Sequence, residues 1–114
     1  MRKLFLALIL LLVPTLILGT RVLAYTSPGL PQGFVNDFAA VLSPAARAEL
    51  EQKLQDFKQE TGHEIVLVTV VSLGGDTVED FTLKLFEEWK IGQKGLDNGA
   101  LLLISKEDRE LRIE

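Results

Sequence analysis

Two apolar runs constrain the fold more than any other feature of this 114-residue chain. Residues 64–71 (EIVLVTVV) are β-branched and almost wholly apolar, and residues 100–105 (ALLLIS) repeat the pattern. Strands of this kind are typical of a sheet that is covered on both faces. An amphipathic helical pattern lies between the two runs, so the sequence predicts a strand-helix-strand unit with parallel strands.

Start and stop signals predict one helix before the first run and one after it. Ser43-Pro44 supplies an N-cap serine and a proline at the first helical position, and Thr61-Gly62 supplies a stop. Thr77 is expected to cap the second helix, with Asp80 as the acid of a capping box. Residues 109–113 alternate and predict an antiparallel strand in a hairpin. We therefore expect a small α/β sandwich with a mixed, mostly parallel central sheet.

The N-terminal 24 residues are expected to stand outside the fold. Arg2 and Lys3 precede the apolar run of residues 4–18, and Val22-Leu23-Ala24 fits an export cleavage site. We predict a signal peptide over residues 1–24; a retained anchor is the alternative, although the run falls short of the roughly 20 residues that span a bilayer. Residues 25–33 (YTSPGLPQG) predict a linker without a fold of its own, followed by a domain over residues 34–114.

Charge and composition exclude several classes of function. Residues 1–24 hold three of the 12 Lys and Arg and none of the 16 Asp and Glu, so their removal changes the net charge from −4 to −7. Nucleic acid is therefore not an expected partner. The chain has no cysteine and one histidine, which excludes disulfides and a tetrahedral nitrogen and sulfur zinc site. No glycine-framed serine nucleophile or phosphate-binding loop is present.

What remains as candidate chemistry is carboxylate and amide oxygen. Asn36-Asp37 and Asp97-Asn98 both lie in otherwise apolar stretches. A carboxylate in such a place pairs, caps a turn or binds a cation, and calcium takes oxygen ligands of this kind. The alternative for both pairs is turn chemistry, with Gly99 following the second pair.

Geometry sets a condition on a shared site. Ligands favour the carboxyl ends of parallel strands, whereas Asp97 precedes its strand. The carboxylates of Asp37 and Asp97 can share a site only if the six residues from Asp37 to Ser43 extend along the sheet toward Asp97. Six extended residues cover about 20 Å, which is long enough.

Five segments within residues 33–114 are informative as a set, and they read GFVNDFAAVLS, EIVLVTVVSLGG, LFEEWKIG, LDNGALLLIS and DRELRIE. Together they resemble the TPM domain family, which has a thylakoid-lumen member in photosystem II repair and members in the bacterial envelope. The resemblance implies an α/β/α sandwich, export and, in some members, calcium binding or weak acid phosphatase activity. Members of the family usually continue with a glycine-rich segment, further helices and a membrane anchor, so we expect this chain to be truncated in its domain.

The resemblance also implies which residues form a site. The metal ligands would be Asp37, Asp97 and Asn98, with Ca²⁺ as the ion. The residues in contact with phosphate or supporting these ligands would be Asn36, Arg109 and Glu114.

Three hypotheses for function follow from this pattern. The first is an exported module that assists a membrane protein complex or another envelope protein, with a structural calcium ion; the sequence favours it because no nucleophile or general base stands out. The second is a weak metal-dependent acid phosphatase of the cell envelope. The third is a lumenal core without either activity. The expected location is the cell envelope, periplasm or extracellular face, or the thylakoid lumen.

Overall fold

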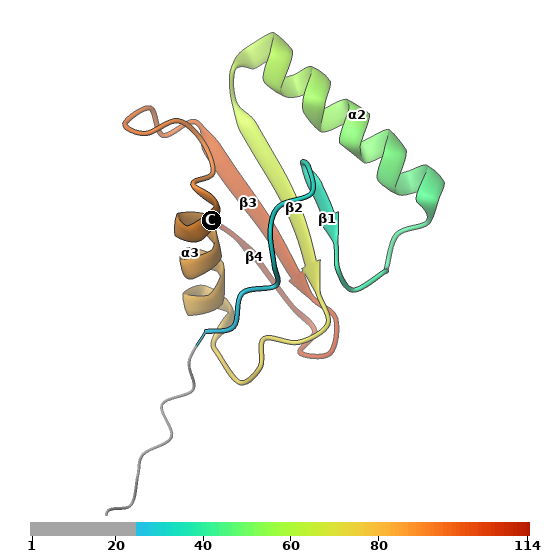
Figure 1. The fold of residues 1–114 in the computed structure, drawn as a ribbon, viewed down its shortest axis with the longest axis vertical. Helices are drawn as coiled ribbons and strands as arrows, with labels where there is room; N and C mark the ends of the chain where they lie inside the picture. The colour runs from blue at the N-terminus through green and yellow to red at the C-terminus, as the bar shows by residue number, and fades with distance from the viewer. Residues whose placement is uncertain (1–24) are drawn as a thin grey trace, which may run out of the picture.

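The computed structural model describes residues 25–114, which form four strands and two helices (Figure 1). The predicted signal peptide lies outside the described residues. The elements are, in chain order, β1 (Val35–Asp37), α2 (Pro44–Thr61), β2 (Glu64–Val70), α3 (Val78–Trp89), β3 (Gly99–Ser105) and β4 (Glu110–Ile113). Within residues 25–114, no helix is long and apolar enough to cross a membrane.

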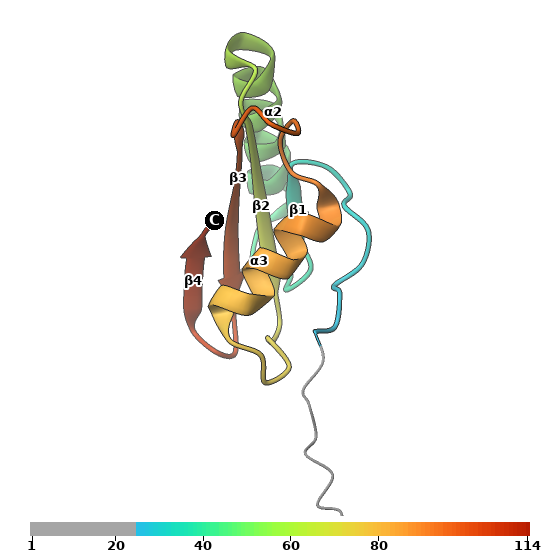
Figure 2. The same ribbon diagram turned by 90° about the vertical axis from the view of Figure 1, so that its left-hand side faces the viewer.

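The sheet is mixed and mostly parallel, as predicted. Its order is β1-β2-β3-β4; β1, β2 and β3 are mutually parallel, and β4 pairs antiparallel with β3. Figures 1 and 2 show α3 on one face of the sheet and α2 on the other, which makes an α/β/α sandwich. The two helices do not cover the sheet equally, because α2 packs on β1 and β2 whereas α3 packs on β3 and β4.

The hydrophobic core lies between the sheet and α3. Alternate residues of the two central strands point to this face, and Leu85 and Phe81 of α3 pack against them. The buried strand residues are Val66, Val68, Val70, Leu101 and Leu103. Burial of each such side chain contributes roughly 1.5–3 kcal/mol. By contrast, no residue of α2 is buried, so its face of the sheet is the weaker layer.

The end signals of α2 act as predicted. The Ser43 hydroxyl accepts a hydrogen bond from Ala46 N at 3.1 Å, and Pro44 is the first helical residue. Gly62 ends the helix in the left-handed conformation with φ 76°, and its N–H donates to Lys58 O at 2.8 Å. Glycine adopts this conformation without the strain that a side chain would add.

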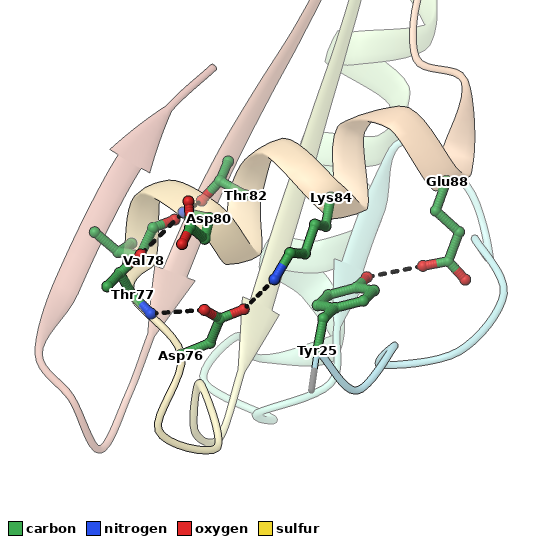
Figure 3. Close-up of polar contacts among 8 residues, drawn as sticks. All are labelled: Tyr25, Asp76, Thr77, Val78, Asp80, Thr82, Lys84 and Glu88. Carbon is green, nitrogen blue, oxygen red and sulfur yellow. Dashed lines mark hydrogen bonds and ion pairs between the residues drawn. The ribbon is translucent and has the colours of Figure 1, made fainter. Parts of the chain in front are cut away.

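The prediction for the start of α3 is wrong in one part. Thr77 is the N-cap and accepts from Asp80 N at 3.1 Å, as expected. Its own N–H, however, donates to the carboxylate of Asp76 at 3.0 Å and not to that of Asp80 (Figure 3). Asp76 precedes the cap directly, so it reaches this amide before the helix begins.

The segment over residues 25–33 contains no helix or strand, as expected of a linker, but it packs against α3. Tyr25 donates to the Glu88 carboxylate at 2.8 Å (Figure 3). The centroid of its ring lies 5.0 Å from that of the Phe81 ring. Trp89 Nε1 donates to Gly29 O at 3.0 Å. Burial, and then the hydrogen bond to Glu88, raise the pKa of Tyr25 above its usual value.

Candidate functional site

Asp37 lies at the carboxyl end of β1 and closes the loop that follows. One of its oxygens accepts from Thr69 Oγ1 at 2.6 Å and from Val41 N at 3.0 Å, and the other accepts from Leu42 N at 2.9 Å. Desolvation opposes the charged form, but these hydrogen bonds outweigh it, so the pKa of Asp37 is below its usual value. The carboxylate is thus ionised and already engaged by the protein.

Asn36 is fully buried and its amide is satisfied by the chain around it. Its Oδ1 accepts from Gln32 N at 2.6 Å. Its Nδ2 donates to Gly33 O at 2.9 Å and to Leu67 O at 3.4 Å. Asn36 therefore holds the segment before β1 against the sheet, and no surface is left for a phosphate.

Asp97-Asn98-Gly99 leads into β3 and joins the loop to the end of α2. Asn98 Oδ1 accepts from Gln93 N at 2.7 Å, and its Nδ2 donates to Gly62 O at 2.9 Å. The main-chain oxygen of Asn98 accepts from Glu64 N at 2.8 Å. The turn before β3 lies at residues 94–96, and Asp97 rather than Gly99 has the positive φ, so the predicted turn chemistry is wrong in its position. Asp97-Asn98-Gly99 connects this turn to β3 and sets Gly99 opposite Glu64 of β2.

The two ends of this loop are in close backbone contact at Gly92 and Gly99. A Cβ on Gly92 would lie 2.8 Å from Gly99 N, and a Cβ on Gly99 would lie 2.7 Å from Gly92 Cα. No real side chain tolerates such contacts, so glycine is required at both positions. Asp97 lies between these two glycines in the sequence; its φ is 47° and its side chain is exposed. Within residues 25–114, its carboxylate accepts no hydrogen bond, which leaves both oxygens available to a ligand.

The structure does not bring Asp37 and Asp97 together. Asp37 is opposite Thr69 of β2, whereas Gly99, two residues after Asp97, is opposite Glu64. Five residues of β2 separate these levels, which is about 16 Å at the rise of a strand. The condition for a shared site is therefore not met, because hydrogen bonds from Val41 N and Leu42 N to Asp37 hold the next residues at the carboxyl end.

A cavity of about 600 Å³ lies beside Asp97, between the end of α3 and the loop that leads to β3. Its charged lining residues are Glu87, Lys90, Lys94 and Asp97. Calcium takes six to eight oxygens, but the described residues contain no group of three acids or histidines placed to hold a metal. Asp97 would supply part of a calcium shell, but Asn98 Oδ1 already accepts from Gln93 N, so main-chain carbonyls or water would have to supply the rest.

The other two predicted site residues lie apart from each other. Arg109 is exposed in the turn after β3, with φ 53°, at the end of the sheet away from Asp97. Glu114 pairs with Leu101 through the main chain and forms an ion pair with Arg112 at 3.1 Å. Arg109 therefore does not meet Asp97 at one phosphate.

The sequence patterns did not predict two carboxylates that accept hydrogen bonds in the fold. Asp108 accepts from Ser105 Oγ and Leu73 N, both at 2.7 Å, and these bonds lower its pKa. Asp108 follows Ser105 by three residues in a hairpin turn, and this local spacing could have predicted their hydrogen bond. Glu51 of α2 accepts from the N–H groups of Phe34 and Val35, a contact without a local signal.

Comparisons with known proteins agree on the fold. A family model of the TPM domain matches residues 35–114. A solution structure of the N-terminal domain of a protein from P. gingivalis is similar, with 30% identity and a TM-score of 0.69 over 80% of this chain and 63% of that one. The N-terminal domain of the cg2496 protein from Corynebacterium glutamicum shares the fold, with 20% identity and a TM-score of 0.61 over 82% and 60% of the two chains.

The chain thus spans less than two thirds of the length of these solved domains. No curated protein matches it.

Proposed function

Because the chain belongs to the TPM domain family over residues 35–114, we propose that it is an exported module that binds a membrane protein complex and does not catalyse a reaction. The basic and apolar pattern of residues 1–24 supports export to the cell envelope, periplasm or extracellular face, or to a thylakoid lumen. A protein partner is supported by one observation in the fold, which is an uncovered apolar strip on the sheet.

The apolar strip consists of Leu102, Ile104, Leu111 and Ile113. The hairpin register sets Leu102 opposite Ile113 and Ile104 opposite Leu111, so all four side chains share one face. This face is opposite the core, because the neighbouring residues Leu101 and Leu103 pack toward α3. α2 lies over β1 and β2 and does not reach the strip, and 59% of Leu111 and 68% of Ile113 are exposed.

An apolar strip of this kind favours contact with another protein surface. Each Leu or Ile side chain that becomes fully buried contributes roughly 1.5–3 kcal/mol before the costs of association. Contiguous exposed apolar residues mark interaction sites more often than isolated ones do. The engaged state of Asp37 also supports binding over catalysis, because its carboxylate is committed to Thr69 and to main-chain amides.

Site-specific photo-crosslinking tests the protein partner. A photoreactive side chain is placed at Leu111 or Ile113 of the exported chain, and at Leu83, which is 44% exposed on α3, as the control. We expect crosslinks to a membrane protein from both β4 positions and none from position 83. Equal products from all three positions, or none, would contradict the proposal.

A second function, weak metal-dependent phosphatase activity, is favoured by the cavity beside Asp97. Lys90 and Lys94 supply positive charge there, and Asp97 has an unengaged carboxylate. The test is hydrolysis of p-nitrophenyl phosphate at acid pH, with calcium or with a chelator, by the native chain and by Asp97→Ala. Turnover that depends on metal and on Asp97 would establish catalysis and overturn the preference for a binding module.

A further inference from the structure

Within residues 25–114, a side chain occupies one edge of the sheet, and the other edge is open. At the β1 edge, the Glu51 carboxylate accepts from Phe34 N at 3.0 Å and from Val35 N at 2.7 Å. These amides are therefore unavailable to another strand. Within the described residues, no side chain does the same at the β4 edge. Unpaired N–H and C=O groups at an edge are a template for pairing with another chain.

The hairpin register decides which groups of β4 face the open edge. Glu114 and Leu101 exchange both of their main-chain hydrogen bonds, at 2.9 and 3.0 Å. Residues of an antiparallel strand alternate between facing the partner strand and facing away from it. Arg112 therefore also faces β3, while Leu111 and Ile113 direct their N–H and C=O groups outward.

We propose that the β4 edge pairs antiparallel with the β4 edge of a second copy of this chain, about a two-fold axis. The strand reads Glu110-Leu111-Arg112-Ile113-Glu114, so its charges alternate in sign on one face and its apolar residues occupy the other. When the axis passes through Leu111 or Ile113, Arg112 of each copy lies opposite a glutamate of the other. An axis through Arg112 would set like charges opposite each other, which disfavours that register.

The charge pattern of β4 favours a second copy of this chain as the strand that pairs with it. A two-fold interface needs a surface that is complementary to itself, and the alternation of glutamate, arginine and glutamate meets that need. The pairing uses the main chain of β4 and brings the two apolar strips side by side on one face. It does not depend on the membrane partner proposed above, because it requires only this chain.

Cysteine trapping tests the pairing cleanly, since the chain has no native cysteine. Leu111→Cys or Ile113→Cys would face its own copy across the axis at a Cα separation of about 5.5 Å, within the range of a disulfide. Leu83→Cys, on exposed α3, is the control. In mild oxidant, we expect at least one β4 variant of the purified exported chain to form a covalent dimer about tenfold faster than the control.

A charge exchange then tests whether these charges control the pairing. Adding Arg112→Glu to the trapping variant should reduce dimer formation to the control rate, with the fold checked by circular dichroism. Mixing that chain with one that carries the same cysteine, Glu110→Arg and Glu114→Arg should restore trapping as a heterodimer. The proposal is overturned if neither β4 cysteine reacts faster than Leu83→Cys, or if charge reversal leaves the rate unchanged.

Discussion

At the scale of single residues, Asp37 shows how an acid in an apolar stretch can serve the fold. Its oxygens accept from Thr69 Oγ1 and from two main-chain amides, and the pKa of the carboxyl is lowered in consequence. A lowered folded-state pKa contributes stability above the unfolded pKa, and this contribution disappears as the pH falls through the folded value.

We therefore expect Asp37→Asn to lose about 1 kcal/mol of unfolding free energy at neutral pH, after allowance for solvent screening. The difference from the native chain should vanish in strong acid, where Asp37 is protonated. Urea titrations across pH measure both. Thr69→Val, which removes the hydroxyl donor, should bring the folded-state pKa of Asp37 nearer to the unfolded value, so the acid-dependent loss of stability should be smaller and complete at a higher pH. A constant difference at every pH would contradict this role.

Gly92 offers a matched comparison with Gly95. Both have positive φ, 81° and 82°, but a Cβ on Gly92 meets Gly99 at 2.8 Å whereas a Cβ on Gly95 meets open space. Gly95→Ala should cost about 1–2 kcal/mol for the left-handed backbone alone. Gly92→Ala should cost about 3 kcal/mol or more, because the loop must also move. Thermal or urea unfolding measures both; equal costs would mean that the crossing is not constrained.

Asp97 is the residue on which a calcium site depends. It lines the cavity with unengaged oxygens, while Asp37 lies at the other end of the sheet. Calorimetry of the purified chain should show weak calcium binding that Asp97→Ala abolishes and Asp37→Ala preserves. Heat that is lost in both variants would place Asp37 in the shell, and heat unchanged in Asp97→Ala would exclude this site.

At the scale of the elements, Glu51 joins α2 to the β1 edge. Its carboxylate accepts hydrogen bonds from two main-chain amides that have no neighbouring strand. Glu51→Ala should therefore lower the free energy of unfolding by about 1–3 kcal/mol, because these donors become unsatisfied. Glu49→Ala is the control, since Glu49 is exposed and forms only a surface ion pair with Lys53. Its cost should be much smaller, because solvent screens this exposed ion pair. Similar losses in the two variants would contradict the capping of β1.

The elements also show what sequence reasoning can reach. Helix ends and the parallel strands follow from short patterns such as Ser43-Pro44 and Thr61-Gly62, whose physics is local. The capping-box pattern predicts that Asp80 accepts from Thr77 N, but Asp76, the residue directly before Thr77, accepts this hydrogen bond. Local patterns could not reveal Glu51 beneath β1 or the separation of Asp37 from Asp97, because both depend on the path of the chain in space.

At the scale of the whole molecule, the sandwich is asymmetric. One face of the sheet is packed against α3. On the other face, α2 covers β1 and β2, and within residues 25–114 no helix packs over the apolar strip, where Leu111 and Ile113 are exposed. Sheets with parallel strands are ordinarily covered on both faces, so the strip is where another surface would complete the layer. This arrangement supports a binding module more directly than it supports catalysis.

Co-migration with membrane complexes tests that account most directly. The comparison is made by native electrophoresis of detergent-solubilised membranes and includes the native chain, the double variant Leu111→Lys/Ile113→Lys and the control Leu83→Lys. We expect the native chain and the control in a high-mass complex and the strip variant free, while circular dichroism shows all three folded. Co-migration of all three chains, or of none, would contradict binding through the apolar strip.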